Sequence, residues 1–252
     1  SLRFQYSVQN FNKFIAVAPV AKNKPTKILK DLNSNLRVTS HQADYIVIAH
    51  EEFKGQAERL VSYRGSQGLS TFFTTTTEIY DEFNHGFDDT YAIKSFLSYV
   101  YLNWNKPSPA YVVLIGDASW NPKMLRPDWL GTEKSDFVPT RLFEAIEDNF
   151  EAASDSWFGH VEGNDVLPEL FIGRLPARTV DQADAMVNKI INYETDFQSG
   201  AWNRTATFCA DNDEGGVLAF EDSSDAFIED LVPKSFQINK VYLQNLGTAG
   251  AR

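Results

Sequence analysis

Apolar residues along this chain follow two periodicities that alternate. Continuous runs rich in β-branched residues, typical of strands buried on both faces, occur at 43–49, 111–115 and 170–174. Apolar residues spaced three or four positions apart, typical of amphipathic helices, lie between these runs. Further strand patterns cover 70–76, 204–210 and 236–243, and helical patterns cover 57–63, 93–104, 183–191 and 224–231. This alternation predicts an α/β fold with a doubly wound, mostly parallel sheet flanked by helices.

Polar and glycine residues indicate where the predicted helices begin and end. Asp88-Asp89-Thr90 supplies cap candidates ahead of the helix at 93–104. Thr179 and Gln182 have the spacing of a capping box ahead of 183–191. Gly65 and Gly68 are expected to close the helix at 57–63.

Two stretches lack a sustained period. Residues 118–164 contain aromatic residues, prolines and many acids, and we expect a long loop region of the kind that is usually functional. Residues 1–42 combine a short apolar run with a basic segment around Pro25, and we interpret them as a lead-in segment rather than a domain. We also expect this sequence to be a piece of a longer protein.

Composition excludes several classes of protein. A chain of 252 residues with 43% hydrophobic content can bury one or two cores, which excludes a disordered protein. The formal net charge of −11 repels phosphate backbones and anionic lipid, so we expect no nucleic-acid partner. The longest apolar runs, such as 111–115, are far shorter than a membrane span.

Cysteine, histidine and glycine patterns limit the chemistry further. No phosphate-binding glycine loop follows any predicted strand, and the four histidines have no zinc-ligand spacing. The single cysteine, Cys209, lies inside an apolar alternation, so we expect it to be buried as a small hydrophobic residue rather than to act as a nucleophile.

Acidic side chains gather at strand ends and in the long loop. Asp117 follows the strand at 111–115, and Asp155, Asp165 and Glu169 lie in or beside the loop. Hard cations such as calcium take six to eight oxygen ligands from carboxylates and loop carbonyls. The residues by themselves leave two interpretations open, a calcium site and a solvated acidic surface.

Several stretches together resemble one family of peptidases. The order and spacing of these stretches are similar to those of the gingipain-type cysteine peptidases over roughly residues 43–216. The stretches are 44–50, 62–69, 79–83, 92–97, 111–117, 168–176 and 189–194. They include Ile115-Gly116-Asp117 and Gly173-Arg174-Leu175-Pro176, which are specific only as a set.

The resemblance implies a caspase-like α/β catalytic domain made of two adjacent subdomains. Residues 43–200 correspond to the complete first subdomain, and residues 201–252 to the beginning of the second, catalytic one. It further implies a secreted or surface-displayed enzyme that cleaves proteins or peptides, and whose first subdomain has the remainder of the catalytic subdomain as its partner.

The resemblance also implies roles for individual residues. A structural calcium ion is expected at Asp117, the carbonyl of Glu162, Asp165 and Glu169. Glu214, followed by two glycines, matches the family's acid that orients the catalytic histidine.

This chain also departs from the family pattern. The family's catalytic histidine and cysteine are expected beyond residue 252, so the chain by itself is expected to be inactive. Glu221, Asp222 and Asp225 cannot be assigned to a specificity pocket. The alternative function is a non-catalytic binding or assembly module of a surface secretion system.

Overall fold

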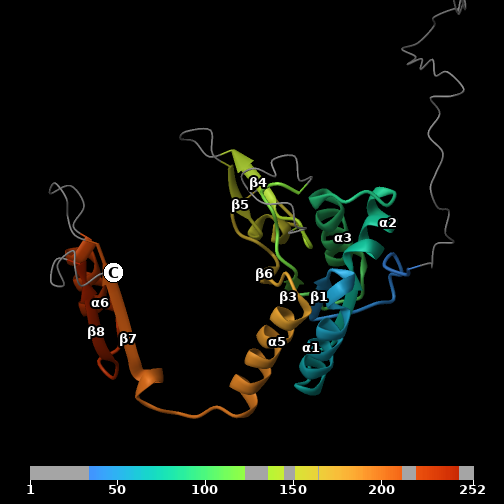
Figure 1. Cartoon of the computed structure of the whole chain (residues 1–252). Helices are drawn as coiled ribbons and strands as arrows, with labels where there is room; N and C mark the ends of the chain where they lie inside the picture. Colours follow the sequence, from blue (N-terminus) through green and yellow to red (C-terminus); the bar gives the residue numbers. More distant parts are fainter. Residues whose placement is uncertain (1–33, 123–135, 145–150, 164, 212–219, 244–252) are drawn as a thin grey trace, which may run out of the picture.

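A computed structural model describes residues 34–122, 136–144, 151–163, 165–211 and 220–243 (Figure 1). The strands are β1 (Tyr45–Ala49), β2 (Thr71–Thr75), β3 (Tyr111–Ile115), β4 (Arg141–Glu144), β5 (Glu151–Ser154), β6 (Phe171–Leu175), β7 (Thr205–Ala210) and β8 (Gln237–Tyr242). The α-helices are α1 (Lys54–Ser66), α2 (Thr76–Asn84), α3 (Thr90–Asn103), α5 (Val180–Thr195) and α6 (Phe220–Leu231). Short 3-10 helices are η2 (Glu51–Phe53), η3 (Ser156–Gly159) and η4 (Ala201–Arg204).

The largest sheet has four parallel strands in the order β2-β1-β3-β6. The inner strand β1 is buried along its whole length, and its central residue Val47 pairs with Phe73 of β2 and Val113 of β3. A strand that is covered on both faces needs apolar residues at every position, and the run at 43–49 supplies them. The predicted parallel α/β sheet is therefore confirmed.

Helices cover both faces of this sheet (Figure 1). Successive strand residues point to opposite faces, so Ile46 and Ile48 join one core cluster and Val47 and Ala49 the other. The first cluster includes α2, α3 and η3, and the second includes α1 and α5. Leu36 is 2% exposed in the first cluster, so the end of the segment that we interpreted as a lead-in packs into the core.

Helix α2 was not predicted, because the threonine-rich stretch 70–76 looked like strand to its end. The strand stops at Thr75, whose hydroxyl accepts a hydrogen bond from the Glu78 backbone N–H at 3.3 Å. The Glu78 carboxylate in turn accepts from the Thr75 backbone N–H at 3.0 Å. This reciprocal capping box satisfies two N-terminal donors and begins a helix where propensity alone favours a strand.

The cap of α5 differs in one detail from the prediction. The Thr179 hydroxyl accepts from the Gln182 backbone N–H at 3.2 Å, as expected for a helix N-cap. The Gln182 side chain, however, accepts from the backbone N–H of Arg178 at 2.8 Å rather than from that of Thr179. The helix start is confirmed, and the reciprocal half of the box is displaced by one residue.

The region 118–164 contains regular structure that the prediction of a long loop missed. Strands β4 and β5 form an antiparallel pair, and η3 follows directly. The two strands have only four residues each and lie mostly exposed or half-buried, so they leave no apolar alternation in the sequence. Residues 123–135, 145–150 and 164 lie outside the described part of the chain.

The last described elements form a small parallel unit of β7, α6 and β8 (Figure 1). Phe208 of β7 packs against Phe227 of α6, and Lys240 and Tyr242 of β8 both reach Asp225 of α6. These contacts place one face of the β7–β8 pair under α6. The boundary at residue 201 between two subdomains stays a prediction.

Candidate functional site

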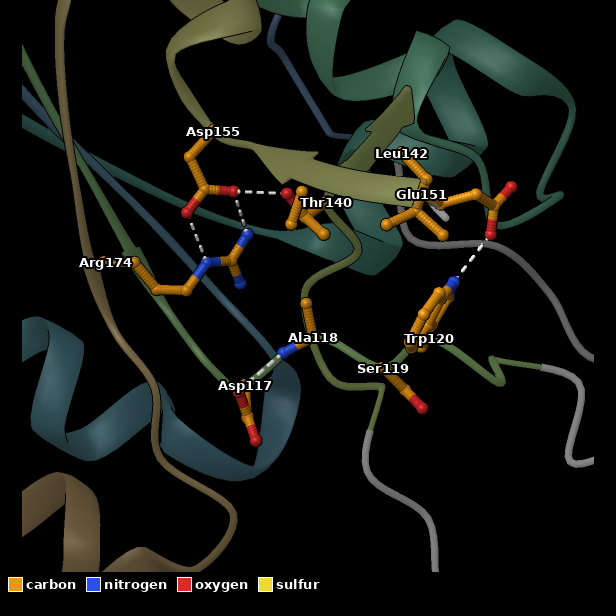
Figure 2. Close-up of a pocket in the computed structure, with 10 residues that line it drawn as sticks. Asp117, Ala118, Ser119, Trp120, Thr140, Leu142, Glu151, Asp155 and Arg174 are labelled. Atoms are coloured by element: carbon orange, nitrogen blue, oxygen red, sulfur yellow. Dashed lines mark hydrogen bonds and ion pairs between the residues drawn. The ribbon is translucent and has the colours of Figure 1, made fainter. Parts of the chain in front are cut away.

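The carboxyl edge of the parallel sheet carries a cavity of about 370 Å³ between the end of β3 and the β4–β5 pair (Figure 2). Sites in open α/β folds form outside the carboxyl ends of the strands, because the loops there converge on one edge. The lining residues are Asp117, Ala118, Ser119, Trp120, Thr140, Leu142, Glu151, Ala153, Asp155 and Arg174.

Arg174 is the most connected residue of this edge. Its Nε donates to Asp155 Oδ2 at 2.7 Å and its Nη2 to Asp155 Oδ1 at 2.8 Å, a two-point ion pair (Figure 2). Nη1 donates to the carbonyls of Gly116 and Val138 at 2.7 and 2.6 Å, and Nη2 also donates to the Pro139 carbonyl at 3.3 Å. All five N–H groups are used, so Arg174 ties the strand ends together and has no donor left for a ligand.

Asp155 stays ionised in this setting. Burial by itself raises the pKa of its carboxyl, but the hydrogen bonds and positive charge of Arg174 outweigh burial and hold the pKa below its usual value. The Thr140 hydroxyl adds a third hydrogen bond at 2.7 Å to Oδ1 (Figure 2). The arrangement is that of a structural ion pair, not of a general acid or base, because a catalytic carboxyl needs a pKa closer to the working pH.

Asp117 lies at the end of β3, where the sequence predicts a cation ligand. Its Oδ2 accepts from Arg178 Nε at 2.5 Å, and its Oδ1 accepts from the Ala118 backbone N–H at 2.9 Å. Its backbone carbonyl accepts from the N–H groups of Phe137 and Val138 at 2.9 and 3.1 Å. Asp117 therefore holds residues 137 and 138 against the end of β3, and Arg178 balances its charge.

The crevice between β1 and β3 is filled by Phe137. This is the point where the strand order reverses, which is the usual ligand position in doubly wound sheets. The Phe137 ring is 6% exposed and lies 5.1 Å from the Phe53 ring and 5.2 Å from the His50 ring, centroid to centroid. Gly116 (φ +141°) lets Phe137 approach, since a Cβ there would lie 2.8 Å from Phe137 Cβ. A small ligand therefore has no room at the switch point.

The predicted calcium ligands Asp165 and Glu169 accept hydrogen bonds from nearby backbone N–H groups. Glu169 accepts from the backbone N–H groups of Val161 and Glu162 at 2.8 and 3.1 Å, and the Glu162 amide is the largest cause that lowers the pKa of Glu169. Asp165 Oδ1 accepts from the Leu167 N–H at 2.8 Å. Among the residues that the structure describes, no three His, Cys, Asp or Glu side chains form a group that could hold a metal ion.

The residues predicted to bind calcium have other partners in this structure. The oxygens are of the right type, and Glu162 and Glu169 lie side by side through one hydrogen bond. Asp117, however, is paired with Arg178 instead. The calcium site stays a prediction.

The prediction that Cys209 is buried was wrong, because the structure places its side chain on the surface. Phe208 faces α6, so the next residue on the strand points to the opposite face, which no described helix covers. None of the four histidines belongs to this unit, since they are residues 41, 50, 85 and 160. Cys209 thus has no histidine base on the elements around it.

The remaining candidate acids belong to the last part of the chain. Glu214 lies outside the described residues. Asp225 is engaged within its own unit, with the Lys240 ammonium 2.7 Å and the Tyr242 hydroxyl 2.5 Å from its Oδ1. Glu221 and Asp222 are in the first turn of α6. The structure therefore gives Asp225 a structural role, which the sequence did not suggest.

Sequence reasoning gave no role to Arg174 or Arg178. A lone arginine inside the otherwise apolar strand pattern at 170–174 is the signal that could have marked Arg174, because a charge placed among apolar residues needs partners nearby. Arg178 gives no such signal, since it lies in a polar connection ahead of α5.

Comparison with known proteins identifies the family. The sequence pattern of peptidase family C25 matches residues 38–251. This chain belongs to peptidase family C25. The family is one of gingipain-like cysteine peptidases, as the motifs indicated.

Individual C25 relatives are distant and much longer. Gingipain R2 of Porphyromonas gingivalis is 22% identical over 187 residues, which are 74% of this chain and 22% of that protein. Gingipain R1 of the same organism is also 22% identical over 187 residues, 16% of its length. This chain thus spans less than a quarter of each of these relatives.

Solved structures support the fold. The Arg-specific cysteine proteinase gingipain R aligns with a TM-score of 0.61 and 18% identity over 85% of this chain and 43% of its own. Dimeric latent PorU from Porphyromonas gingivalis aligns with a TM-score of 0.55 and 24% identity over 65% of this chain and 17% of its own. These likenesses confirm the caspase-like α/β class that the resemblance implied. Within the described residues, no helix is long and apolar enough to cross a membrane.

Proposed function

We propose that the protein containing this chain is a cysteine endopeptidase that hydrolyses peptide bonds in proteins or peptides. The single observation that carries the proposal is the C25 match over residues 38–251. The parallel sheet, its helical layers and its tied carboxyl edge are consistent with a scaffold that holds a neighbouring catalytic unit. The remainder of the catalytic subdomain is its proposed partner.

The proposed chemistry is acyl transfer through a cysteine thioester. A thiolate attacks the peptide carbonyl, and a histidine takes and returns the proton. We place both groups outside residues 1–252, because the only cysteine of this chain and its four histidines lie on separate units. Glu214 is proposed to orient the histidine and is the catalytic residue that we assign to this chain.

Hydrolysis of quenched fluorescent peptides by the whole protein tests this function. Cys209→Ser is expected to leave the rate unchanged, while Glu214→Gln is expected to lower kcat and to shift its pH profile. Glu229→Gln, on the exposed side of α6, is the control for loss of one negative charge. A whole protein that cleaves no peptide, or whose activity depends on Cys209, would contradict the proposal.

We propose, as the family resemblance implies, that calcium stabilises the protein at Asp117, the Glu162 carbonyl, Asp165 and Glu169. Binding there requires Asp117 to exchange its Arg178 partner for the ion. Calcium is then expected to raise the melting temperature relative to chelator, and Asp165→Asn to reduce the difference. Arg178→Gln is expected to enlarge it, because Asp117 loses its competing cation. Identical melting curves with calcium and with chelator would exclude the site.

We propose that the protein is secreted or displayed at the cell surface, as the resemblance implies. Detection in the medium or by surface labelling of intact cells tests this location. Recovery only from the soluble cell interior would overturn it.

The second candidate function is a non-catalytic binding or assembly module of a surface secretion system. It is supported by the structural likeness to PorU, a protein described as latent. The peptide assay separates the two functions, because a module of this kind binds its partners but hydrolyses nothing.

A further inference from the structure

Arg141 of β4 is a cation without an acidic partner. Leu142 lines the cavity at the carboxyl edge, and successive strand residues point to opposite faces, so Arg141 and Phe143 lie on the other face of the β4–β5 pair. Among the described residues, the Arg141 guanidinium makes no ion pair and donates no hydrogen bond. Arg174 and Arg178, by contrast, each pair with a carboxylate. The charge of Arg141 is therefore left for a ligand.

Three aromatic rings hold the Arg141 guanidinium in place. Its Cζ lies 5.2 Å from the centroid of the Tyr91 ring of α3 and 5.4 Å from that of the Trp157 ring of η3. The centroid of the Phe143 ring lies 5.2 Å away. Aromatic rings attract guanidinium groups through their faces. The rings of Tyr91 and Trp157 also contact each other, with centroids 5.2 Å apart at an angle of 84°. Arg141 is thus positioned by three separate elements.

Lys94 fixes the Trp157 ring. Its ammonium lies 4.9 Å from the ring centroid and donates to the backbone carbonyls of Trp157 and His160. The Trp157 side chain also packs against the first core cluster. The Glu169 carboxylate acts on the Lys94 charge and offsets it. The positive charge that remains uncompensated at these rings is therefore that of Arg141.

The end of the Arg141 side chain is open to a ligand. Its Nε is buried, and in the part of the chain that the structure describes it has no hydrogen-bond partner. Nη1 and Nη2 have no partner there either, but they are not buried. Their N–H groups lie in one plane, and a carboxylate accepts two parallel hydrogen bonds from such a pair. Tyr91 and Phe143 are 52% and 41% exposed, so they offer apolar contact beside the carboxylate.

Charge and residue type favour an acidic side chain of a protein over a polyanion. The net charge of −11 repels nucleic acid, whereas one carboxylate experiences little of this repulsion. Arginine, tryptophan and tyrosine are the residues that most often dominate the binding energy of protein interfaces. An arginine that is already held by rings also loses little side-chain freedom on binding.

We propose that Arg141, with the exposed rings of Tyr91 and Phe143, is a docking site for an aspartate or glutamate side chain of a partner protein. The carboxylate lies against Nη1 and Nη2 of Arg141. An apolar side chain next to the acid in the partner lies against the two exposed rings. This recognition requires no hydrolysis, so it does not depend on the proposed peptidase activity.

Calorimetric titration of the full chain with capped Leu-Glu-Leu, Leu-Gln-Leu and Leu-phosphoserine-Leu peptides tests this site. The glutamate peptide is expected to bind about tenfold more tightly than the glutamine peptide, because only the carboxylate carries a charge. Arg141→Gln is expected to abolish that difference. Tyr91→Ala is expected to weaken the binding of both peptides, because it removes apolar contact. The control is Arg204→Gln, which removes the same charge from an exposed position in η4 and is expected to leave the difference unchanged.

Equal affinities for the glutamate and glutamine peptides, or saturable binding of neither, would overturn the proposal. An equal loss from Arg204→Gln would overturn it as well. A phosphoserine peptide that binds more than about tenfold more tightly than the glutamate peptide would assign the site to phosphate instead. If circular dichroism shows that Arg141→Gln has lost its fold, Arg141→Lys decides, since it keeps the charge but lacks the planar pair of nitrogens and is expected to lose most of the difference. Peptide hydrolysis is measured separately, so failure of this site is distinguishable from failure of the peptidase function.

Discussion

Arg174 and Asp155 form a two-point ion pair, with Nε–Oδ2 and Nη2–Oδ1 distances of 2.7 and 2.8 Å, between β6 and the residue that follows β5. The pair links a strand of the parallel sheet to the segment between β5 and η3. The three carbonyl hydrogen bonds of Arg174 extend that link to the end of β3 and to residues 138 and 139. Arg174 therefore connects β6 with the end of β3 and with the segments on either side of the β4–β5 pair.

Replacing Arg174 by glutamine is expected to destabilise the fold by about 3 kcal/mol, because it leaves a half-buried carboxylate unpaired and frees three carbonyls. Urea unfolding followed by circular dichroism measures this loss. The control is Arg59→Gln, which breaks a pair with Asp184 whose side chains are 41% and 37% exposed. Its expected cost is below about 1 kcal/mol. Equal losses of unfolding free energy in the two variants would contradict this role of Arg174 at the carboxyl edge.

Stability should also report on Asp155 as the pH is lowered. Arg174 holds the folded-state pKa of Asp155 below its usual value, although burial opposes this. The stabilisation is present above the unfolded pKa of about 3.9 and is lost as the pH falls through the folded-state value. The difference in unfolding free energy between wild type and Asp155→Asn is thus expected to shrink below about pH 4. A difference that stays constant from pH 6 to pH 3 would show that the carboxylate charge contributes nothing.

Gly116 is expected to tolerate no side chain. Gly116→Ala adds a Cβ at a φ of +141° and 2.8 Å from Phe137 Cβ, so we expect a loss of several kcal/mol and a lower melting temperature. Gly55→Ala is the matched control, since that glycine is helical and a Cβ there meets nothing within 4 Å. The control is expected to be neutral or to stabilise by up to about 1 kcal/mol. Similar melting temperatures for the two variants would refute the packing of Phe137 against Gly116.

Cys209 is expected to react with a thiol reagent in the native protein. The side chain is exposed on the face of the β7–β8 pair opposite α6. One equivalent of label without denaturant, and none in Cys209→Ser, is the expected result of a colorimetric thiol assay. Labelling that requires denaturant would mean that other parts of the protein cover this face.

Periodicity predicted the elements whose environment is uniform. Strand β1 is apolar at each position because both faces are covered, and α3 presents its apolar residues at helical spacing because one side packs on the sheet. Helix α2 was not predicted, because the two reciprocal hydrogen bonds between Thr75 and Glu78 override the strand preference of threonine. Strands β4 and β5 were not predicted either, because short, exposed strands bury too few residues to produce an alternation of apolar and polar positions.

The candidate site, too, was predicted only in part from the sequence. The sequence identified Asp117, Asp155 and Glu169 as notable acids, because carboxylates at strand ends and in loops stand out along a chain. It did not show that Arg178 neutralises the first and Arg174 the second. Cys209 was judged by its apolar neighbours in sequence, whereas its exposure depends on which face of the strand a helix covers.

The sequence by itself determined the α/β class, the order of the main strands and helices, and the C25 family, since these depend on local periodicity and on motif spacing. The tertiary structure alone decided the pairing of charges at the carboxyl edge, the filling of the switch point by Phe137 and the position of Arg141 against the rings of Tyr91 and Trp157. Each of these joins residues from separate segments, and their distances are set by the packing of the sheet and its layers. Residue type and spacing show which charges are present, and only the fold shows which of them are balanced.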